Sequence, residues 1–297
     1  GQINGSSFSD AMKFSEFSLN EAKRHGKNCC YIFCREDYEK FLRKRTLSQL
    51  LRRAVTHNFK GFEAYLQPLV NTDTNTVYGA ESLMRFHTDK LGTVSPSEFI
   101  PLLEETGLII PVGKWMLNEA MKFCHEIQKT IPDFKISINI SYVQVIKSNI
   151  IMEILNAVKY YHIPPSTIII ELTESGLVDL DSRVIKLWSR LKENGICLAL
   201  DDFGTGYSNF HYLNELKPDI IKIDRTFTIK AVSNDYEFKL LSLMSNMVHS
   251  MDLRICVEGV ENTNELSRMK ELLPDYYQGY YFGKPCPFNE FQEKFVS

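Results

Sequence analysis

The chain has 297 residues, and its 34 Lys and Arg against 37 Asp and Glu give a formal net charge of −3 at pH 7. A charge this close to neutral argues against a protein that coats nucleic acid or binds membranes through a polybasic surface. A hydrophobic content of 44% is typical of a globular protein, and the length suits one large domain with an appendage or two smaller domains.

No apolar run approaches the length that crosses a bilayer, and the N-terminus does not resemble a secretory signal. The seven cysteines are scattered and none forms a C-x-x-C pair, which argues against a zinc site. Cys197 and Cys256 lie in apparent strands, where we expect small core residues. These features predict a reduced, cytoplasmic chain, and any membrane attachment of a longer protein would come from domains outside it.

The first 58 residues lack the alternation of strand-like and helix-like segments that marks the rest of the chain. Residues 11–25 have helical spacing that ends at Gly26, and residues 29–33 are compatible with one short strand. Residues 35–58 form a long, charge-rich helical pattern with leucines along one stripe. We therefore expect residues 1–58 to be the end of another domain followed by a connecting helix.

From residue 59 onward, strand-like and helix-like segments alternate. The expected strands cover residues 62–70, 77–86, 135–141, 167–173, 196–201, 219–224, 253–258 and 276–282. The expected helices cover residues 96–107, 112–129, 143–160, 182–194, 208–216, 235–251 and 262–272. The sequence SPSE at 95–98 predicts a capping box with proline at the first helical position.

This alternation predicts an α/β fold. The central strands are apolar on both faces, as in parallel strands that helices cover. The short connection at 71–76 makes the first two strands antiparallel. Residues 59–297 are therefore predicted to form a (β/α)8 TIM-type barrel with an antiparallel first strand. The alternative is an open doubly wound sheet, which would normally place its site at one switch point rather than around a ring.

Two adjacent carboxylates, Asp201 and Asp202, follow a buried strand and precede a glycine-punctuated turn at 203–207. A divalent cation would offset their repulsion and desolvation, whereas the alternative is that Asp202 caps the next helix. The glycines are not a dinucleotide fingerprint, because Asn209 stands where the third glycine is required. We interpret the turn as a mobile lid that positions Asp202.

Polar side chains end the other predicted strands as well. They are Glu81 with Arg85, Asn139, Glu171 with Glu174, Lys222, Glu258 with Glu261, and Gln278. The carboxyl ends of barrel strands form one rim, so these groups should converge. Oxygen-rich ligands select Mg²⁺ or Mn²⁺. No histidine falls on the predicted rim, which argues against a zinc hydrolase and against histidine acid–base catalysis.

A rim with two cations, a lysine and an arginine suits phosphodiester hydrolysis. Two cations can clamp the attacking and leaving oxygens and acidify a water. Arg85 can hold a phosphate oxygen, although an arginine at a strand end is also a common partner of a buried acid.

Seven segments in order resemble the EAL-domain family of cyclic di-GMP phosphodiesterases. They are AESLMR at 80–85, SINIS at 137–141, ELTE at 171–174, DDFGTGYS at 201–208, KID at 222–224, EGVE at 258–261 and QGYYFGKP at 278–285. The resemblance covers residues 62–297, roughly four-fifths of the chain. It implies hydrolysis of cyclic di-GMP to linear pGpG, which degrades a second messenger of bacterial signalling.

The resemblance also implies a two-cation site for Mg²⁺ or Mn²⁺. One cation would be held by Glu81, Asn139, Glu171 and Asp201. Asp201 would bridge to a second cation, held with Asp202 and Glu258. Lys222 would orient the attacking water, with Glu258 or Glu261 helping as base, and Glu174 would pin the loop at 201–208. The residues assigned to the substrate are Arg85, Gln278 and Asp224.

One departure from the family pattern is visible, because the namesake Glu-Ala-Leu is Glu81-Ser82-Leu83 here. Ser82 is small and points to the opposite face from Glu81, so we expect little effect on catalysis. Residues 11–33 resemble the C-terminal end of a GGDEF domain, which predicts a remnant of one. Family members often pair through the helices beside the loop at 201–208, so a homodimer is expected there.

Two other functions remain open from the sequence. The same fold can bind cyclic di-GMP as a catalytically silent receptor. An unrelated barrel phosphodiesterase acting on lipid or sugar phosphates is the third possibility, although such enzymes usually employ histidines. A nucleic-acid polymer is not an expected partner.

Overall fold

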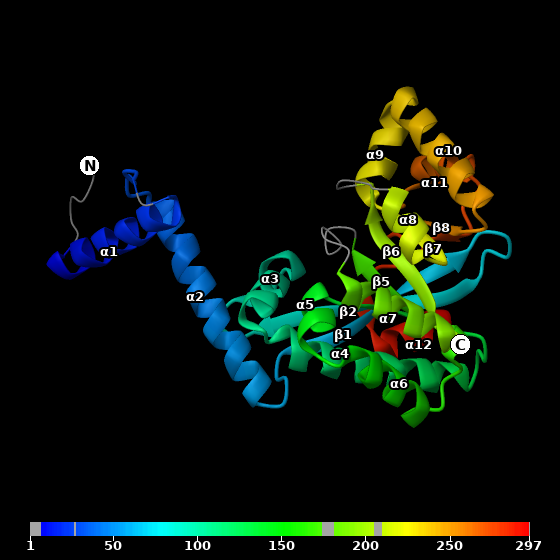
Figure 1. Ribbon diagram of the computed structural model, residues 1–297, viewed down its shortest axis with the longest axis horizontal. Coiled ribbons are helices and arrows are strands. Elements are labelled where there is room, and N and C mark those ends of the chain that lie inside the picture. The colour runs from blue at the N-terminus through cyan, green and yellow to red at the C-terminus, as the bar shows by residue number, and fades with distance from the viewer. Residues whose placement is uncertain (1–6, 27, 174–180, 205–209, 297) are drawn as a thin grey trace.

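Eight strands close into a barrel in the computed structural model, which describes residues 7–26, 28–173, 181–204 and 210–296. The order around the ring is β1 (Phe62–Asn71), β9 (Tyr276–Tyr277), β8 (Arg254–Val257), β7 (Ile220–Ile223), β6 (Cys197–Phe203), β5 (Ile168–Thr173), β4 (Lys135–Asn139) and β2 (Val77–Thr88). Pairing between β1 and β2 closes the ring. The predicted α/β barrel is therefore confirmed (Figure 1).

The first strand runs against its neighbours, as predicted. β1 pairs antiparallel with both β2 and β9, whereas the remaining neighbours in the ring pair in parallel. The turn between β1 and β2 is too short for the crossover that a parallel pair needs. Two short strands that the sequence pattern did not predict, β3 (Gly92–Val94) and β10 (Cys286–Pro287), lie outside the ring beside β2 and β1.

Side chains alternate between the barrel interior and the helices outside. Leu198 and Leu200 of β6 belong to the large apolar cluster that the strands form with the surrounding helices. Ala199, between them, belongs to a small interior cluster with Ile169 and Cys256. This period-two alternation explains why rim residues two positions apart face the same cavity.

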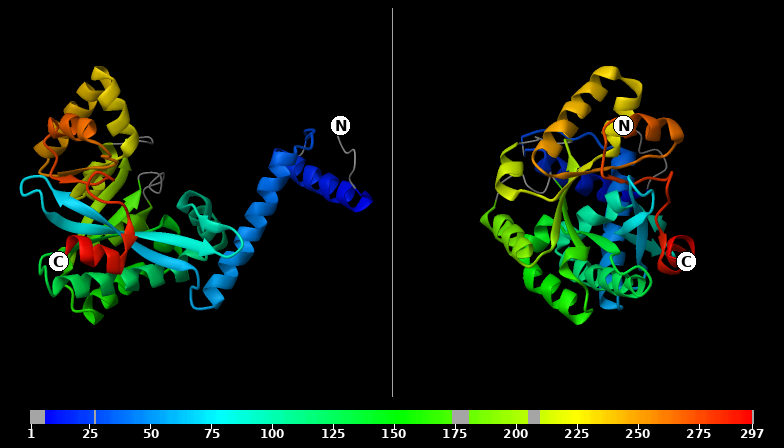
Figure 2. Two further views of the ribbon diagram at one scale, coloured as in Figure 1. Left: turned by 180° about the vertical axis from the view of Figure 1, so that it is seen from behind. Right: turned by 90° about the vertical axis from the view of Figure 1, so that its right-hand side faces the viewer.

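Helices pack around the barrel (Figure 2). They are α3 (Pro96–Thr106), α4 (Ile109–Gln128), α5 (Tyr142–Lys147), α6 (Ile150–Tyr160), α7 (Ser182–Glu193), α8 (Phe210–Leu216), α9 (Arg225–Ser233), α10 (Asp235–Ser250), α11 (Thr263–Lys270) and α12 (Phe288–Phe295). A 3-10 turn, η1 (Pro165–Thr167), precedes β5. The sequence pattern did not predict α9 or α12.

The helix expected at 143–160 is two helices, α5 and α6. Ser148 ends α5 in an extended conformation, and its hydroxyl donates to the carbonyl of Gln144. A serine that bonds the local backbone in this way competes with continuation of the helix. The capping box expected at 95–98 is also wrong, because the Ser95 hydroxyl pairs with Ser97 and Glu98 accepts two hydrogen bonds from Arg43 of the connecting helix.

Two expected strands are shorter or missing. The last strand is limited to β9, because the chain turns at Gly279, whose carbonyl accepts from the backbone N–H groups of Phe282 and Gly283. Residues 29–33 form no strand; instead, Phe33 stacks on Phe14 with ring centroids 4.5 Å apart. Aromatic packing, rather than sheet pairing, orders this segment.

The N-terminal helices α1 (Phe8–Arg24) and α2 (Arg35–Thr56) extend from one side of the barrel (Figure 2). The C-terminal half of α2 packs on the barrel, because Leu47 and Leu51 are fully buried in a cluster with Phe62 and Phe99. In the part of the chain that the structure describes, no helix combines the length and apolarity of a membrane span.

Candidate functional site

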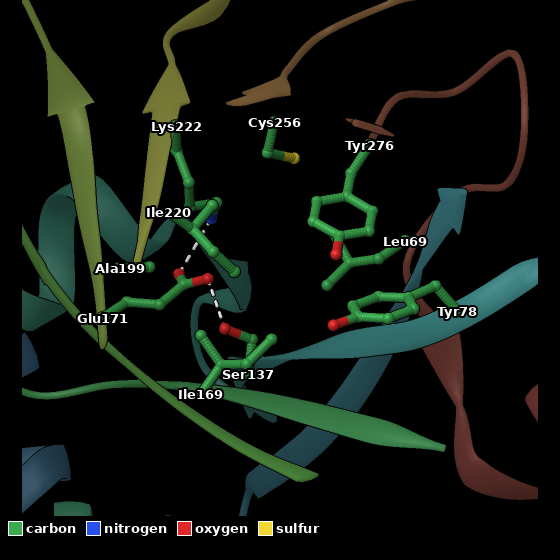
Figure 3. A pocket seen from close by; sticks show the side chains of 10 residues that line it. All are labelled: Leu69, Tyr78, Ser137, Ile169, Glu171, Ala199, Ile220, Lys222, Cys256 and Tyr276. Atoms are coloured by element: carbon green, nitrogen blue, oxygen red, sulfur yellow. Dashed lines mark hydrogen bonds and ion pairs between the residues drawn. The ribbon is translucent and has the colours of Figure 1, made fainter. Parts of the chain in front are cut away.

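A buried lysine lies at the centre of the predicted rim. Lys222 of β7 is 2% exposed, and its ammonium group is surrounded by carboxylates from four other positions in the ring. The Nζ atom lies 2.7 Å from Glu258, 2.8 Å from Glu171, 3.3 Å from Glu81 and 3.6 Å from Asp201. Figure 3 shows Lys222 reaching across the barrel interior toward Glu171. Barrel closure thus brings together acids that are far apart in the sequence.

Uncharged donors complete the hydrogen bonding of these acids. Asn139 donates its Nδ2–H to Glu81 Oε1 over 2.6 Å, and Gln278 donates its Nε2–H to Glu81 Oε2 over 2.6 Å. Ser137 donates its hydroxyl to Glu171 Oε1. Glu81 therefore accepts from an amide on each side as well as from Lys222, and its carboxylate has a fixed orientation.

The charges do not balance within this cluster: one ammonium faces four carboxyl groups. Burial raises the pKa of Glu258 to about 8, and burial together with Asp201 raises the pKa of Asp202 to about 6. Burial also raises the pKa of Glu171 well above its usual range. Burial opposes the charge of Lys222, yet the surrounding acids raise its pKa well above the ordinary value. Excess buried negative charge of this kind is stabilised by a bound cation.

The donor atoms in this cluster are of the type that a hard divalent cation prefers. Oxygen atoms of Glu81, Glu171, Asp201 and Glu258 lie close together, and such ligands suit Mg²⁺ or Mn²⁺. Within the described ranges, no group of three or more acidic, His or Cys side chains is arranged so that it could hold a metal ion. The carboxylates converge instead on the Lys222 ammonium. A bound cation would share these oxygens with Lys222.

The two adjacent aspartates take different positions. Asp201 is nearly buried and faces Lys222, whereas Asp202 is half-buried in a left-handed conformation with φ of 54°. A register shift between β6 and β7 at this point lets both carboxyl groups lie at the rim. The helix-cap alternative for Asp202 is wrong, because Asp202 lies within strand β6 and is followed by Phe203 of the same strand.

The other predicted residues have varied surroundings. Arg85 is half-buried over the ring of Tyr65, and it lines a cleft of about 570 Å³ together with Glu81, Asn139 and Asp201. The cleft therefore leads from the carboxylates toward the guanidinium group of Arg85. Glu174 lies outside the described residues, as do residues 205–209 of the predicted lid.

Two predicted residues are engaged by α9 instead of by the central cluster. Asp224 caps this helix by accepting from the backbone N–H of Thr226 over 2.9 Å. Glu261 forms an ion pair with Arg225, with Oε1 and Nη1 2.6 Å apart. α9 thus holds the segment that follows β8.

Sequence reasoning did not assign a role to Ser137 or Gln67. Gln67 of β1 accepts from Gln278 Nε2 over 3.1 Å, and Ser137 contacts Glu171. The sequence feature that could have revealed Ser137 is the alternation of side chains along β4, in which Ser137 shares a face with Asn139. Serine and glutamine are also common core residues, so this signal alone did not mark them.

Comparison with known proteins connects this site to a family. The EAL domain family matches residues 48–285. The probable cyclic di-GMP phosphodiesterase PdeG of Escherichia coli K12 is 32% identical over 261 residues, which cover 88% of this chain and 51% of that protein. The chain spans about a third to a half of the length of the curated relatives it matches.

Two solved structures have the same fold. A structure of the EAL enzyme Bd1971 in its cAMP-bound form has a TM-score of 0.80 and 30% identity, covering 87% of this chain and 72% of that one. The PaMucR phosphodiesterase in complex with c-di-GMP has a TM-score of 0.77 and 29% identity, covering 83% of this chain and 99% of that one. The chain belongs to the EAL domain family.

Proposed function

We propose that this chain hydrolyses cyclic di-GMP to linear pGpG with Mg²⁺ or Mn²⁺, and so removes a second messenger of bacterial signalling. The observation that carries the proposal is the convergence of Glu81, Glu171, Asp201 and Glu258 on the ammonium group of Lys222. It is supported by the relatives whose names include cyclic di-GMP phosphodiesterase.

The excess negative charge supports a cation at this rim. Glu81, Asn139, Glu171 and Asp201 would hold one cation, and Asp201 with Asp202 and Glu258 would hold a second. Cations bound there would acidify a water and neutralise charge on the phosphodiester. Asn139 presents its amide nitrogen to Glu81, which leaves its carbonyl oxygen as a ligand.

The chain's own residues supply orientation and a proton acceptor. The ammonium of Lys222 would donate to the attacking water, and Glu258, 2.7 Å from Lys222, would accept the water proton. The water oxygen would then bond to phosphorus while the bond from phosphorus to one ribose 3′-oxygen breaks, which opens the ring, and the leaving oxygen would take up a proton from solvent. Arg85, which lines the cleft, would hold a phosphate oxygen of the substrate. Gln278, which donates a hydrogen bond to Glu81, would also contact the substrate.

The contacts of α9 favour Glu258 over Glu261 as the base. Glu261 pairs with Arg225, and the Thr228 hydroxyl donates to the carbonyl of Glu258 over 2.8 Å. Glu261 would therefore anchor the loop that carries Glu258. Asp224, at the start of α9, would support the same loop rather than contact the substrate directly. Glu174 keeps its proposed role of pinning the loop at 201–208.

The direct test is conversion of cyclic di-GMP to pGpG with Mg²⁺ or Mn²⁺, comparing the native chain with Glu81→Ala. We expect turnover by the native chain and a loss of about 10³-fold or more in the variant, because Glu81 would be a cation ligand. A glycerophosphodiester should not be hydrolysed. Binding of cyclic di-GMP without turnover by the native chain would overturn the proposal and leave a receptor.

Adding Mn²⁺ is expected to raise the melting temperature of the native chain, because a cation that binds only the folded state stabilises it. The rise should be larger at about pH 8.5 than at about pH 6. The pKa values of Glu258, about 8, and Asp202, about 6, mean that these acids hold protons at the lower pH, and the cation must displace them.

The matched control for this measurement is Glu81→Ala at the same ionic strength. It should lose most of the Mn²⁺-dependent rise at both pH values. An equal rise in the native chain and the variant would contradict a cation site at Glu81.

Three further expectations stay predictions: a cytoplasmic location, a GGDEF remnant in residues 11–33, and a homodimer through the helices beside residues 201–208. Analytical ultracentrifugation with and without cyclic di-GMP tests the last of these. A chain extended before residue 1 would test whether residues 11–33 are the C-terminal end of a cyclase-like domain.

A further inference from the structure

A small cavity lies inside the barrel, with Glu171 and Lys222 of the carboxylate cluster in its wall (Figure 3). Its polar wall consists of Ser137, Glu171 and Lys222, which are 0%, 1% and 2% exposed. Its other walls are Leu69, Tyr78, Ile169, Ala199, Ile220, Cys256 and Tyr276. The space is about the size of one water molecule, and the acid at its edge, Glu171, is hydrogen-bonded by protein groups.

Both oxygens of Glu171 are engaged within this wall. Oε1 accepts from the Ser137 hydroxyl, and Oε2 accepts from Lys222 Nζ over 2.8 Å. On the opposite wall, the hydroxyl oxygens of Tyr78 and Tyr276 accept from the guanidinium of Arg254 over 3.5 and 3.1 Å. Ser137 is therefore the neutral donor that sets the second oxygen of Glu171.

Strand β4 places Ser137 for this contact. Ser137 and Asn139 are two residues apart, so they share the inward face, and β4 runs parallel to β5 with Asn139 beside Glu171. Asn139, the last residue of β4, donates to Glu81, whereas Ser137, two residues earlier in the strand, donates to Glu171. One strand thus orients two carboxylates from its two neighbouring strands, β2 and β5, with two uncharged side chains.

We propose that Ser137 is a positioning residue for Glu171. Its hydrogen bond to Oε1 holds the Glu171 carboxylate so that Oε2 faces Lys222 and the rim, where a cation and the reacting groups would lie. The proposal rests on the proposed function for its catalytic consequence, although the Ser137–Glu171 contact does not. Partners of this kind behind a ligand typically change cation affinity or activity by about 10–100-fold when they are removed.

The test compares two variants that match each other in shape, Ser137→Thr and Ser137→Val. Ser137 borders the cavity, and both variants add the same branch at this position, so any cost of fitting it there is shared by the two. Threonine keeps the hydroxyl donor and valine lacks it. Because valine differs from threonine only by that donor, a difference between the two reports on the hydrogen bond rather than on packing.

We expect the valine variant to lose about 10–100-fold in kcat, with KM for cyclic di-GMP changed little, and to bind Mn²⁺ about tenfold more weakly. The threonine variant should stay within about threefold of the native chain in each quantity. In crystals of the metal-free variants, Glu171 should keep its orientation with threonine and rotate away from residue 137 with valine.

Glu171 in the native orientation in the valine crystal, or equal losses of kcat in both variants, would overturn the proposal. If the native chain shows no turnover, the proposed function fails, and the two crystal structures still decide whether Ser137 orients Glu171.

Discussion

Replacement of Lys222 by Met is expected to abolish turnover and to destabilise the cation-free protein. Among the described residues, Lys222 supplies the ammonium that Glu81, Glu171, Asp201 and Glu258 share, and it is 2% exposed. Methionine keeps the length of the side chain but leaves the buried acids without their counter-charge. Removal of one partner from such a buried ion pair typically costs about 3–5 kcal/mol.

Turnover of cyclic di-GMP should fall by about 10³-fold in this variant, since the ammonium would orient the attacking water and stabilise developing charge. Chemical denaturation measures the stability loss, and product analysis measures the turnover. Mn²⁺ should restore part of the lost stability without restoring turnover, because a cation replaces the missing charge but not the donor.

Lys129→Met is the control for this experiment. Lys129 is an exposed lysine paired with Glu126 at 2.7 Å, so its loss should change stability by less than about 1 kcal/mol and leave turnover unchanged. If Lys222→Met retained turnover within about tenfold of the native chain, the assigned role of Lys222 would be wrong.

The barrel was predictable from the sequence because its strands carry a strict pattern. In β6, outward Leu198 and Leu200 flank inward Ala199, and the same period places Asp201 at the rim. Asp201 and Glu171 could therefore be assigned to one site from the order of residues alone. Helix α9 was missed because its mixed, weakly amphipathic sequence gives little helical periodicity.

The partner of each side chain could not be predicted in the same way. Glu258 and Glu261 lie three residues apart in one motif, yet the first contacts Lys222 and the second contacts Arg225. Which acid faces inward depends on the turn after β8 and on the position of α9. Similarly, the role of Ser137 becomes visible only when the pairing of β4 with β5 brings Glu171 beside it.

Replacement of Gly279 by Ala is expected to damage both the fold and the site. A Cβ atom at this position would lie 2.0 Å from the carbonyl oxygen of Val260 and 2.4 Å from its nitrogen, and backbone atoms cannot move aside as a flexible side chain does. The turn after β8 and the turn after β9 are in direct contact here, and the Val260 N–H donates to the carbonyl of Gln278 over 3.2 Å.

Separation of these two turns would move the residues they carry. Gln278 would withdraw from Glu81, to which it donates over 2.6 Å, and Glu258 would withdraw from Lys222. We expect the free energy of unfolding to fall by about 3 kcal/mol, at the upper end for overpacking. Turnover should fall by more than about tenfold, because both residues lose their positions.

Gly107→Ala separates this steric effect from the ordinary cost of replacing a glycine. Gly107 has φ of 73° at the end of α3, and a Cβ there would meet nothing within 4 Å. It should therefore cost only about 1–2 kcal/mol of backbone strain and leave turnover unchanged. Denaturation and cyclic di-GMP hydrolysis of both variants make the comparison. Equal stability losses with full turnover in Gly279→Ala would show that the contact between the two turns does not position Gln278 and Glu258.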